Sequence, residues 1–310
     1  MKKIKMILDC DPGHDDAIAI MMAGNNPKID LLGITVVAGN QTLEKTGYNT
    51  LNLCQYLNID VPVCLGASEP LIKEIQVCPD IHGETGLDGF DFQELTKNFD
   101  NRPAVHFLAE TILKSEDKIT IVTTGPMTNL AIALKLFPKM KENIKEVVLM
   151  GGSYQNGNVT PAAEYNIYAD PEAAYIVFNS GLEVKMFGLD VTRRVQVLPE
   201  IIERMEKLDN KASVLFSKLM KVYNINQNRV FGVAGGPLHD PLPVVYLIDP
   251  SVVDLVHVHC DIDISHSSSY GRTNCDIFNY LKLPKNAHVA IKVDTEKYWD
   301  IIEAGIKRYT

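Results

Sequence analysis

The stretch of sequence that decides the fold is IKMILDCDPGHDDAIAIMMAG, residues 4–24. Its first five residues are almost all apolar, as in a strand buried on both faces of a parallel sheet. Pro12-Gly13 then marks a turn, and a second apolar segment, residues 16–23, has the length and pattern of a helix. The stretch therefore predicts a strand, a turn and a helix, which is the repeating unit of an α/β fold.

The same alternation of short and long apolar segments continues along the chain. Further strands are predicted at residues 31–37, 119–123, 146–150, 184–189, 252–258 and 288–293. Further helices are predicted at residues 42–57, 103–113, 128–136, 171–179 and 198–207. Residues 75–101 form a polar loop, and residues 211–237 are helical at first and then irregular. We expect one domain, residues 1–310, with a mostly parallel open (Rossmann-like) sheet and helices on both faces.

Composition excludes several classes of function. The chain has 30 basic and 39 acidic residues, a formal charge of −9, and 46% of its residues are hydrophobic. The acidic excess argues against a nucleic-acid partner and against an anionic membrane surface. The chain contains no run of the roughly 18 apolar residues that a membrane span needs. Asp9 interrupts the apolar run that a signal peptide requires, and the six cysteines lack CxxC spacing, so we expect a cytoplasmic protein with reduced thiols.

Small and acidic residues follow the predicted strands. The acidic turn follows the first strand, Ala38-Gly39-Asn40 the second, and Thr124-Gly125-Pro126 the strand at residues 119–123. Gly151-Gly152 follows the next strand. Because ligands of open α/β sheets bind beyond the carboxyl ends of the strands, we expect the active site at this edge.

Four aspartates fall within eight positions of the acidic turn: Asp9, Asp11, Asp15 and Asp16. Carboxylates gathered at a strand end would repel one another unless a cation neutralised them, and oxygen ligands suit Ca²⁺ or Mg²⁺. The alternative is an ordinary strand–turn–helix connection, in which Asp15 caps the helix and the other carboxylates lie on the surface. Spacing alone favours the metal site.

Three other motifs have ordinary structural interpretations as well as functional ones. Asp240 precedes Pro241 and could simply cap a helix. His82 lies in a polar loop, where a histidine is more often exposed than catalytic. The segment 157–166 could be a capped loop before the helix that starts near Pro171.

Together these motifs resemble those of the inosine–uridine nucleoside hydrolases. The resemblance covers nearly the whole chain, and its motifs occur in order: DCDPGHDDA at residues 9–17, AGN at 38–40, HG at 82–83, GPMTNLA at 125–131, MGG at 150–152, residues 158–166 and GPLHD at 236–240. The resemblance implies a single α/β domain that hydrolyses the N-glycosidic bond of ribonucleosides to ribose and free base. It also implies one Ca²⁺ per subunit and assembly into dimers or tetramers.

The resemblance assigns roles to individual residues. It implies Ca²⁺ ligation by Asp11, Asp16, Asp240 and the backbone carbonyl of Thr124. It places the ribose among Asp15, Asn40, Asn158, Glu164 and Asn166. It places the base among His82, Gln227, Phe231 and His239. Asp9 is then expected to orient the loop.

The implied chemistry is direct displacement by a water that Ca²⁺ positions. Asp11 acts as the general base, and His239 is the acid for the leaving base because imidazole titrates near neutral pH. We expect uridine and cytidine as substrates, because Gln227 can bind a pyrimidine edge and the base-pocket motifs are similar to the pyrimidine-preferring branch. Phe231 departs from that branch, which usually has a tyrosine there.

Three alternatives remain at this point. One is a non-specific purine and pyrimidine nucleoside hydrolase. Another is a metal-dependent phosphohydrolase, although the motifs contain neither the Lys or Arg that phosphate needs nor a GxxxxGK[ST] loop. The third is a nucleoside sensor, which would be expected to lack Asp11 or His239.

Overall fold

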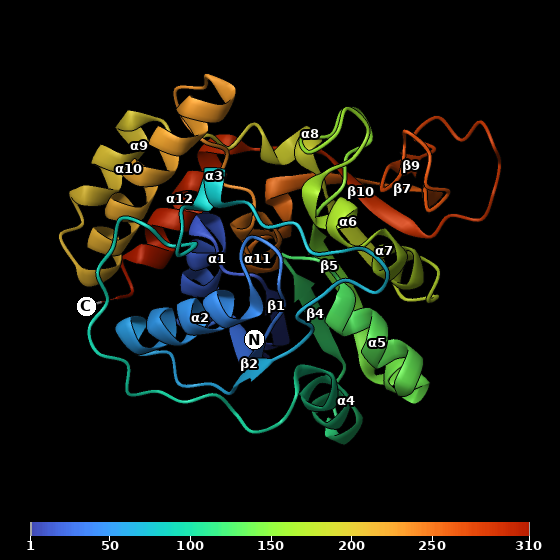
Figure 1. Cartoon of the computed structure of the whole chain (residues 1–310), viewed down its shortest axis with the longest axis horizontal. Coiled ribbons are helices and arrows are strands. Elements are labelled where there is room, and N and C mark those ends of the chain that lie inside the picture. The colour runs from blue at the N-terminus through green and yellow to red at the C-terminus, as the bar shows by residue number, and fades with distance from the viewer. Residues whose placement is uncertain (1, 310) are drawn as a thin grey trace.

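Eight strands form one sheet in the order β3-β2-β1-β4-β5-β6-β10-β7 (Figure 1). The computed structural model describes residues 2–309. The sheet consists of β1 (Ile4–Cys10), β2 (Ile29–Val36), β3 (Val63–Leu65), β4 (Ile119–Thr123), β5 (Ile144–Met150), β6 (Val184–Phe187), β7 (Val253–Val258) and β10 (Ala287–Val293). Neighbouring strands are parallel except for β10 and β7. A separate two-stranded sheet joins β8 (Cys260–Ile262) to β9 (Thr273–Cys275).

The strand order fixes where a ligand can bind. From β1 the chain proceeds outward to β2 and β3, and then returns to the other side of β1 to form β4. The order therefore reverses between β1 and β4, and a crevice opens at their carboxyl ends. Asp9 of β1 lies level with Thr35 of β2 and Thr123 of β4, so the residues that follow these strands meet at one place.

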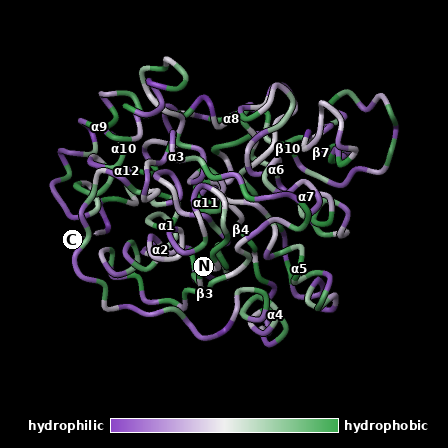
Figure 2. Tube along the Cα trace, in the orientation of Figure 1, coloured by the Kyte–Doolittle hydropathy of each residue, from purple (hydrophilic) through white to green (hydrophobic). Residues whose placement is uncertain are grey.

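Helices cover both faces of the sheet. One face packs against α1 (His14–Gly24), α2 (Leu43–Leu57), α9 (Pro199–Glu206), α10 (Lys211–Phe231), α11 (Pro241–Ile248) and α12 (Thr295–Ile306). The other face packs against α4 (Ala104–Lys114), α5 (Thr128–Leu136) and α7 (Pro171–Phe178). Short helices occur at α3 (Pro79–His82), α6 (Tyr165–Ala169), α8 (Leu189–Thr192), η1 (Pro138–Asn143) and η2 (Pro250–Val252). The outer helices are amphipathic, as the mixed colours of α4 and α5 show (Figure 2).

The alternation of side chains along β1 explains why both faces are apolar. Met6 and Leu8 point into the core beneath α1, whereas Ile7 points into the core beneath α4 and α5, and all three are fully buried. A strand with helices on both sides must be apolar at every position, which is the pattern that predicted it.

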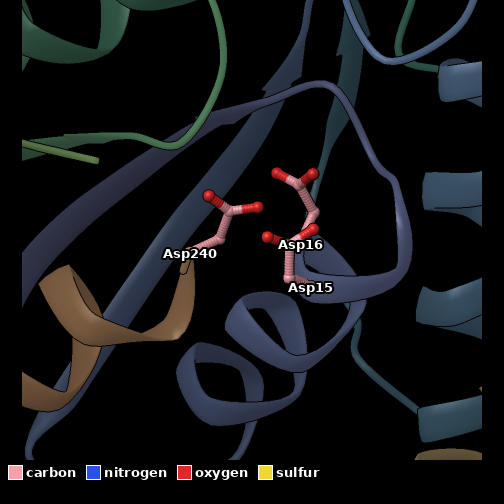
Figure 3. Close-up of side chains that lie close together, drawn as sticks. All are labelled: Asp15, Asp16 and Asp240. Atoms are coloured by element: carbon pink, nitrogen blue, oxygen red, sulfur yellow. The ribbon is translucent and has the colours of Figure 1, made fainter. Parts of the chain in front are cut away.

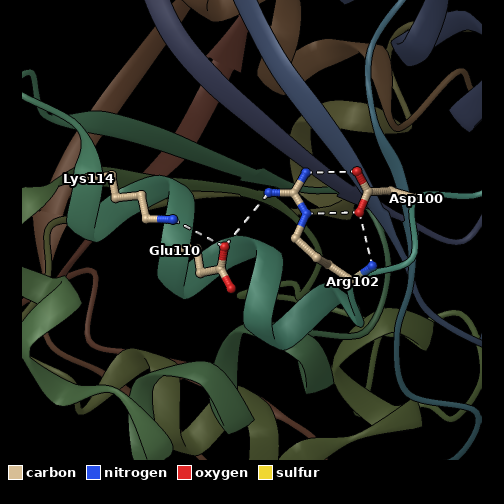
Figure 4. A network of polar contacts seen from close by, with 4 residues as sticks. All are labelled: Asp100, Arg102, Glu110 and Lys114. Atoms are coloured by element: carbon tan, nitrogen blue, oxygen red, sulfur yellow. Dashed lines mark hydrogen bonds and ion pairs between the residues drawn. The ribbon is translucent and has the colours of Figure 1, made fainter.

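The long loop between β3 and α4 follows the surface and is fixed at its end. Arg102 forms two hydrogen bonds to the Asp100 carboxylate, at 2.8 and 2.7 Å, just before α4 begins (Figure 4). Glu110 on α4 lies 4.0 Å from the same guanidinium and 3.4 Å from Lys114. The bidentate geometry makes the Asp100–Arg102 pair the strongest contact of this exposed network.

The predicted fold class is confirmed, and each predicted strand and helix has a counterpart in the structure. Three details differ. Strand β7 runs antiparallel at the edge, β6 ends at Phe187 because Leu189 already begins α8, and α10 continues to Phe231. The predicted domain, residues 1–310, is described here for residues 2–309. Within that range no helix is long and apolar enough to cross a membrane.

Candidate active site

Three carboxylates meet at the carboxyl edge of the sheet. Asp15 and Asp16 come from the first turn of α1 and Asp240 from the residue before α11, and their side chains point toward one another (Figure 3). One oxygen from each lies within 4.8 Å of the others, and at most 4% of any of these residues is exposed. Within residues 2–309 no other group of His, Cys, Asp or Glu meets this geometry.

Helix capping explains little of this cluster. The cap of α1 is Gly13, whose backbone N–H donates to Asp16 Oδ2 at 3.0 Å, so the suggestion that Asp15 caps the helix is wrong. Asp240 stands at the N-cap position of α11 but accepts no capping hydrogen bond. Neither side chain therefore caps a helix, so capping does not account for the position of Asp15 or Asp240.

Asp11 lies deeper, between two glycines. A Cβ on Gly39 would stand 2.1 Å from Asp11 Oδ2, and one on Gly125 would stand 2.3 Å from Oδ1. Neither position therefore has room for a Cβ while the Asp11 side chain stays in place. Oδ2 accepts the Asn40 backbone N–H at 2.7 Å, whereas Oδ1 is buried without a partner.

Asp9 supports the site from beneath, as expected. Its Oδ1 accepts hydrogen bonds from Thr35 Oγ1 at 2.5 Å and Asn129 Nδ2 at 2.8 Å. Asn129 also donates to the Val36 carbonyl, so this network joins the ends of β1 and β2 to α5. Asp9 is fully buried and does not line the cavity.

Burial makes ionisation of these carboxylates unfavourable. Desolvation raises the pKa of Asp11 and Asp240 well above the usual value, with neighbouring aspartates adding to the effect. Desolvation and Asp16 raise the pKa of Asp15 to about 7. The donors are all oxygen, and Asp11 Oδ1 and Asp15 Oδ1 have no hydrogen-bond partner. This donor set fits a hard divalent cation, which would neutralise the charges.

Three polar side chains in and before α6 are oriented by hydrogen bonds to backbone groups. Glu164 caps α6 and accepts the backbone N–H groups of Gly152, Asn166 and Ile167, at 2.8 to 3.2 Å. Asn166 Nδ2 donates to the Thr124 carbonyl at 2.7 Å, and Asn158 Oδ1 accepts the Tyr165 N–H at 2.9 Å. The Asn166 carbonyl oxygen and the Asn158 amide nitrogen are therefore the polar ends left for a ligand.

The tautomer of His82 is set by the chain itself. Its Nδ1 lies 3.2 Å from the backbone N–H of His14, which can only donate. Nδ1 must then be the acceptor, and the proton is on Nε2. Burial, with His14 and His239 nearby, lowers the pKa of His82 well below its usual value, so the neutral ring carries one N–H donor. The ring stacks against Tyr223, with centroids 5.9 Å apart.

His239 directly precedes Asp240 in the segment before α11. Its Nδ1 lies 2.7 Å from Thr192 Oγ1, which leaves Nε2 for a ligand. Desolvation, with a smaller contribution from Arg193, lowers the pKa of His239 to about 3. The ring is therefore neutral at neutral pH, and the expectation that it titrates near the working pH is wrong. It can still donate from Nε2 when the Thr192 hydroxyl donates to Nδ1.

These residues line one cavity of about 350 Å³, within the usual range for small-ligand sites. Every site residue expected from the sequence lines it except Asp11 and Asp16, which lie behind its floor. Sequence reasoning missed Tyr223, which precedes Gln227 and Phe231 by four and eight residues on α10 and so shares their helix face. It also missed Arg193, whose guanidinium donates to the Asn156 and Gly157 carbonyls.

A buried cluster of oxygen donors beside a polar cavity at the switch point of an α/β sheet is an arrangement that can bind a cation and a small polar substrate, as in a hydrolase. The chain belongs to the family described as inosine-uridine preferring nucleoside hydrolase, whose model matches residues 6–300. The family predicted from the motifs is thereby confirmed.

Known relatives cover the whole chain. It is 47% identical over 309 residues to the pyrimidine-specific ribonucleoside hydrolase RihB of Escherichia coli O1:K1, covering 100% of this chain and 99% of that protein. A solved purine-preferring ribonucleoside hydrolase from Gardnerella vaginalis is 32% identical with a TM-score of 0.90, covering 98% of this chain and 99% of that chain. The plant nucleoside hydrolase PpNRh1 is 29% identical with a TM-score of 0.91 and the same coverage.

Proposed function

We propose that this protein hydrolyses the N-glycosidic bond of pyrimidine ribonucleosides, uridine and cytidine, with one Ca²⁺ per subunit. The observation that carries the proposal is the arrangement of the cavity. Its floor is a buried carboxylate cluster, and two neutral histidines lie among the residues that line it. A ribosyl bond that breaks places positive charge on the sugar and negative charge on the base, so a cavity lined by both carboxylates and neutral N–H donors matches the two charges.

The ribose end is built from groups that accept and donate hydrogen bonds in fixed directions. Asp15 Oδ1, the Asn166 carbonyl oxygen and the Asn158 amide nitrogen are free, and each is held by contacts on its other side or by burial. Asn40 and Glu164 complete the set assigned to the sugar. Groups that are already oriented lose little entropy on binding and favour a ligand whose hydroxyls satisfy all of them.

Asp11, Asp16, Asp240 and the Thr124 carbonyl are the proposed cation ligands, with Asp15 close enough to share the site. A Ca²⁺ ion held by these residues would neutralise their charges and would help to position the attacking water. Asp11 then accepts the proton of that water. Its Oδ1 has no hydrogen-bond partner and is available for that role.

The leaving base needs hydrogen-bond donors, because it departs with negative charge. His82 donates from Nε2, and His239 donates from Nε2 when Thr192 holds its Nδ1. Both rings are neutral, so they stabilise the base as directed N–H donors. His239 therefore acts as a hydrogen-bond donor to the departing base, which takes its proton from solvent.

Pyrimidine preference rests on α10 and on the 47% identity to RihB. Gln227 is 5% exposed and lines the base end together with Tyr223. A glutamine amide matches the carbonyl and N–H edge of uracil or the carbonyl and amino groups of cytosine. Phe231 supplies an apolar wall at the mouth, where it is 52% exposed.

The remaining features of the proposal concern the cellular form of the enzyme. All six cysteines are free, which supports a reducing, cytoplasmic location. We also propose a homo-oligomer, a tetramer or a dimer, on the basis of the family.

Product analysis tests the proposed reaction. The calcium-loaded protein is incubated separately with uridine, cytidine, inosine and adenosine, and free base and ribose are quantified by chromatography. We expect equal amounts of ribose and uracil or cytosine, with a higher kcat/KM for the two pyrimidines. A higher kcat/KM for inosine would overturn the base preference, and release of inorganic phosphate from nucleotides without any release of free base would overturn the reaction class.

A further inference from the structure

A segment outside the active site brings two cysteines together. Residues 259–286 leave the sheet between β7 and β10, and Figure 1 shows this excursion projecting at the right of the molecule. Its base is the hairpin of β8 and β9, in which Cys260 and Cys275 are directly opposite. Their sulfur atoms are 3.3 Å apart, and both thiols are free.

The register of the hairpin places this pair where a cross-strand disulfide fits. Asp276 donates its backbone N–H to His259 O at 2.8 Å, and Asp263 donates to Arg272 O at 3.0 Å. Hydrogen-bonded and non-hydrogen-bonded pairs alternate along an antiparallel ladder, so Cys260 and Cys275 form a non-hydrogen-bonded pair. Such pairs have Cα atoms about 4.5 Å apart, which lies within the range that disulfides span.

We propose that Cys260 and Cys275 are a redox-active dithiol that low-molecular-weight disulfides oxidise to a cross-strand disulfide. Cys275 is the thiol that reacts first, because it is partly exposed whereas Cys260 is 1% exposed. The contact with the neighbouring Cys275 sulfur and burial also raise the pKa of Cys260, which keeps it a thiol until its neighbour has reacted.

The exchange balances in two steps. The Cys275 thiolate attacks one sulfur of the small disulfide, breaks its S–S bond and releases one small thiol. Cys260 then loses its proton and attacks the Cys275 sulfur, forming the protein disulfide and releasing the second small thiol. Overall, two thiol hydrogens of the protein are transferred to the small disulfide, which is reduced.

The hairpin contacts a segment beside the substrate site through Thr273 of β9. Thr273 lies two positions before Cys275 and so on the same face of the strand. Its hydroxyl accepts the Ser153 N–H at 2.8 Å and donates to the Ser153 carbonyl at 2.7 Å. Ser153 follows Gly152, whose N–H is bound by Glu164. The hairpin thus supports the segment that positions Glu164.

A disulfide formed between side chains already in contact preserves this support. It closes the loop between residues 260 and 275 and limits the freedom of the unfolded chain, while Thr273 stays in place. The oxidised protein therefore keeps its activity and withstands heat better. The pair acts as a staple that forms under oxidising conditions.

The crosslink is tested on the native full-length protein with oxidised glutathione as the probe, followed by alkylation of the remaining thiols and peptide mass mapping. We expect wild type to lose about 2 Da, with Cys260 and Cys275 joined in one crosslinked peptide and no glutathione retained. Cys260→Ser retains a glutathione adduct on Cys275, and Cys275→Ser forms neither product. The matched control Cys78→Ser, which removes another partly exposed cysteine, forms the crosslink like wild type.

The result for the wild-type protein alone tests the proposed disulfide. Absence of the Cys260–Cys275 peptide from folded protein after exhaustive oxidation, with the same peptide formed only in urea, would overturn the proposal. Oxidation is expected to raise Tm by about 5 °C, reversibly on reduction, and to change kcat by less than about twofold. A large loss of kcat that reduction restores would overturn the staple and indicate a switch.

Discussion

Replacing His239 with alanine probes how the leaving base is stabilised. The ring lines the cavity, and Thr192 holds its Nδ1 at 2.7 Å, so Nε2 is directed to the ligand. Loss of a general acid costs about 10²- to 10⁴-fold in rate, and a hydrogen bond to a charged group contributes about 1.5–3 kcal/mol. Because the His239 ring is neutral, only the hydrogen bond is lost, and its contribution of about 1.5–3 kcal/mol predicts that His239→Ala lowers kcat on uridine about 10- to 150-fold.

The assay compares two leaving groups. Wild type and His239→Ala are measured on uridine and on 4-nitrophenyl riboside, whose phenolate leaves as a stable anion and needs no proton. We expect a loss of less than about tenfold on the nitrophenyl substrate, because its phenolate leaving group is already a stable anion and gains little from a hydrogen bond to His239. Equal losses on both substrates would refute the assignment of His239 to the leaving base.

Thr192 provides a graded control for the same contact. Thr192→Val keeps the shape but removes the hydroxyl that holds Nδ1, and one neutral hydrogen bond contributes about 1 kcal/mol. We expect about a fivefold loss of kcat on uridine and none on the nitrophenyl riboside, with Thr192→Ser close to wild type. A Thr192→Val enzyme that loses activity equally on both substrates would show a structural role.

The pH profile distinguishes a neutral donor from an imidazolium acid. An acid with an ordinary histidine pKa of about 6.5 would lose activity tenfold per pH unit above that value. With the pKa of His239 at about 3, the ring is already neutral throughout this range. We therefore expect no fall in kcat/KM on uridine between pH 6.5 and 8, whereas ionisation of Glu164, whose pKa burial raises to about 7, acts in the opposite direction. A tenfold fall per pH unit in this range would contradict the account.

Three further predictions concern the sugar, the glycines and the carboxylates. Deoxyuridine, which leaves a buried polar group unpaired, should have a kcat/KM about 10⁴-fold below that of uridine, and a difference under tenfold would refute the ribose assignment. Gly125→Ala, whose Cβ would stand 2.3 Å from Asp11 Oδ1, should abolish uridine hydrolysis while circular dichroism stays native; full activity would show that Asp11 can move. Burial raises the pKa of Asp9, Asp15 and Glu164 to about 7, above their unfolded values, so the chelated protein binds protons more tightly when folded. Its Tm should fall as pH rises from about 4 to about 7, and much less with Ca²⁺; a rise over that window would contradict the carboxylate account.

The periodicity of the sequence was sufficient to predict the sheet, because strands buried on both faces must be apolar throughout. Short elements were missed for a physical reason. Strands β3, β8 and β9 have three residues each, too few for a pattern, and their position depends on contacts distant in sequence. Helices α11 and α12 are longer and were not predicted, although each begins after an aspartate that marks a helix start, Asp240 before Pro241 and Asp294 before Thr295. The sequence pattern did not show that β7 is antiparallel, because the direction of this edge strand is set by its pairing with β10.

The site was predicted where its residues lie close together in sequence. The carboxylates at residues 9–16 were visible as a cluster, and Asp240 was recognisable only with the family motif. The protonation state of His239 could not be predicted, because its pKa depends on burial by elements far apart in the chain. Tyr223 could have been found from its four-residue spacing to Gln227, whereas the contact of Arg193 with the loop at residues 156–157 needed the folded structure.

The dependence of uracil release on Ca²⁺ tests the central claim most directly. The protein is stripped of metal with a chelator, the chelator is removed, and uracil release from uridine is measured as Ca²⁺ is added back to wild type and to Asp16→Asn. We expect the stripped wild type to be inactive and to recover with saturable Ca²⁺ dependence, whereas Asp16→Asn needs far more Ca²⁺ or does not recover. Full activity of thoroughly stripped wild type would contradict the proposal that the buried carboxylates form a cation site required for hydrolysis.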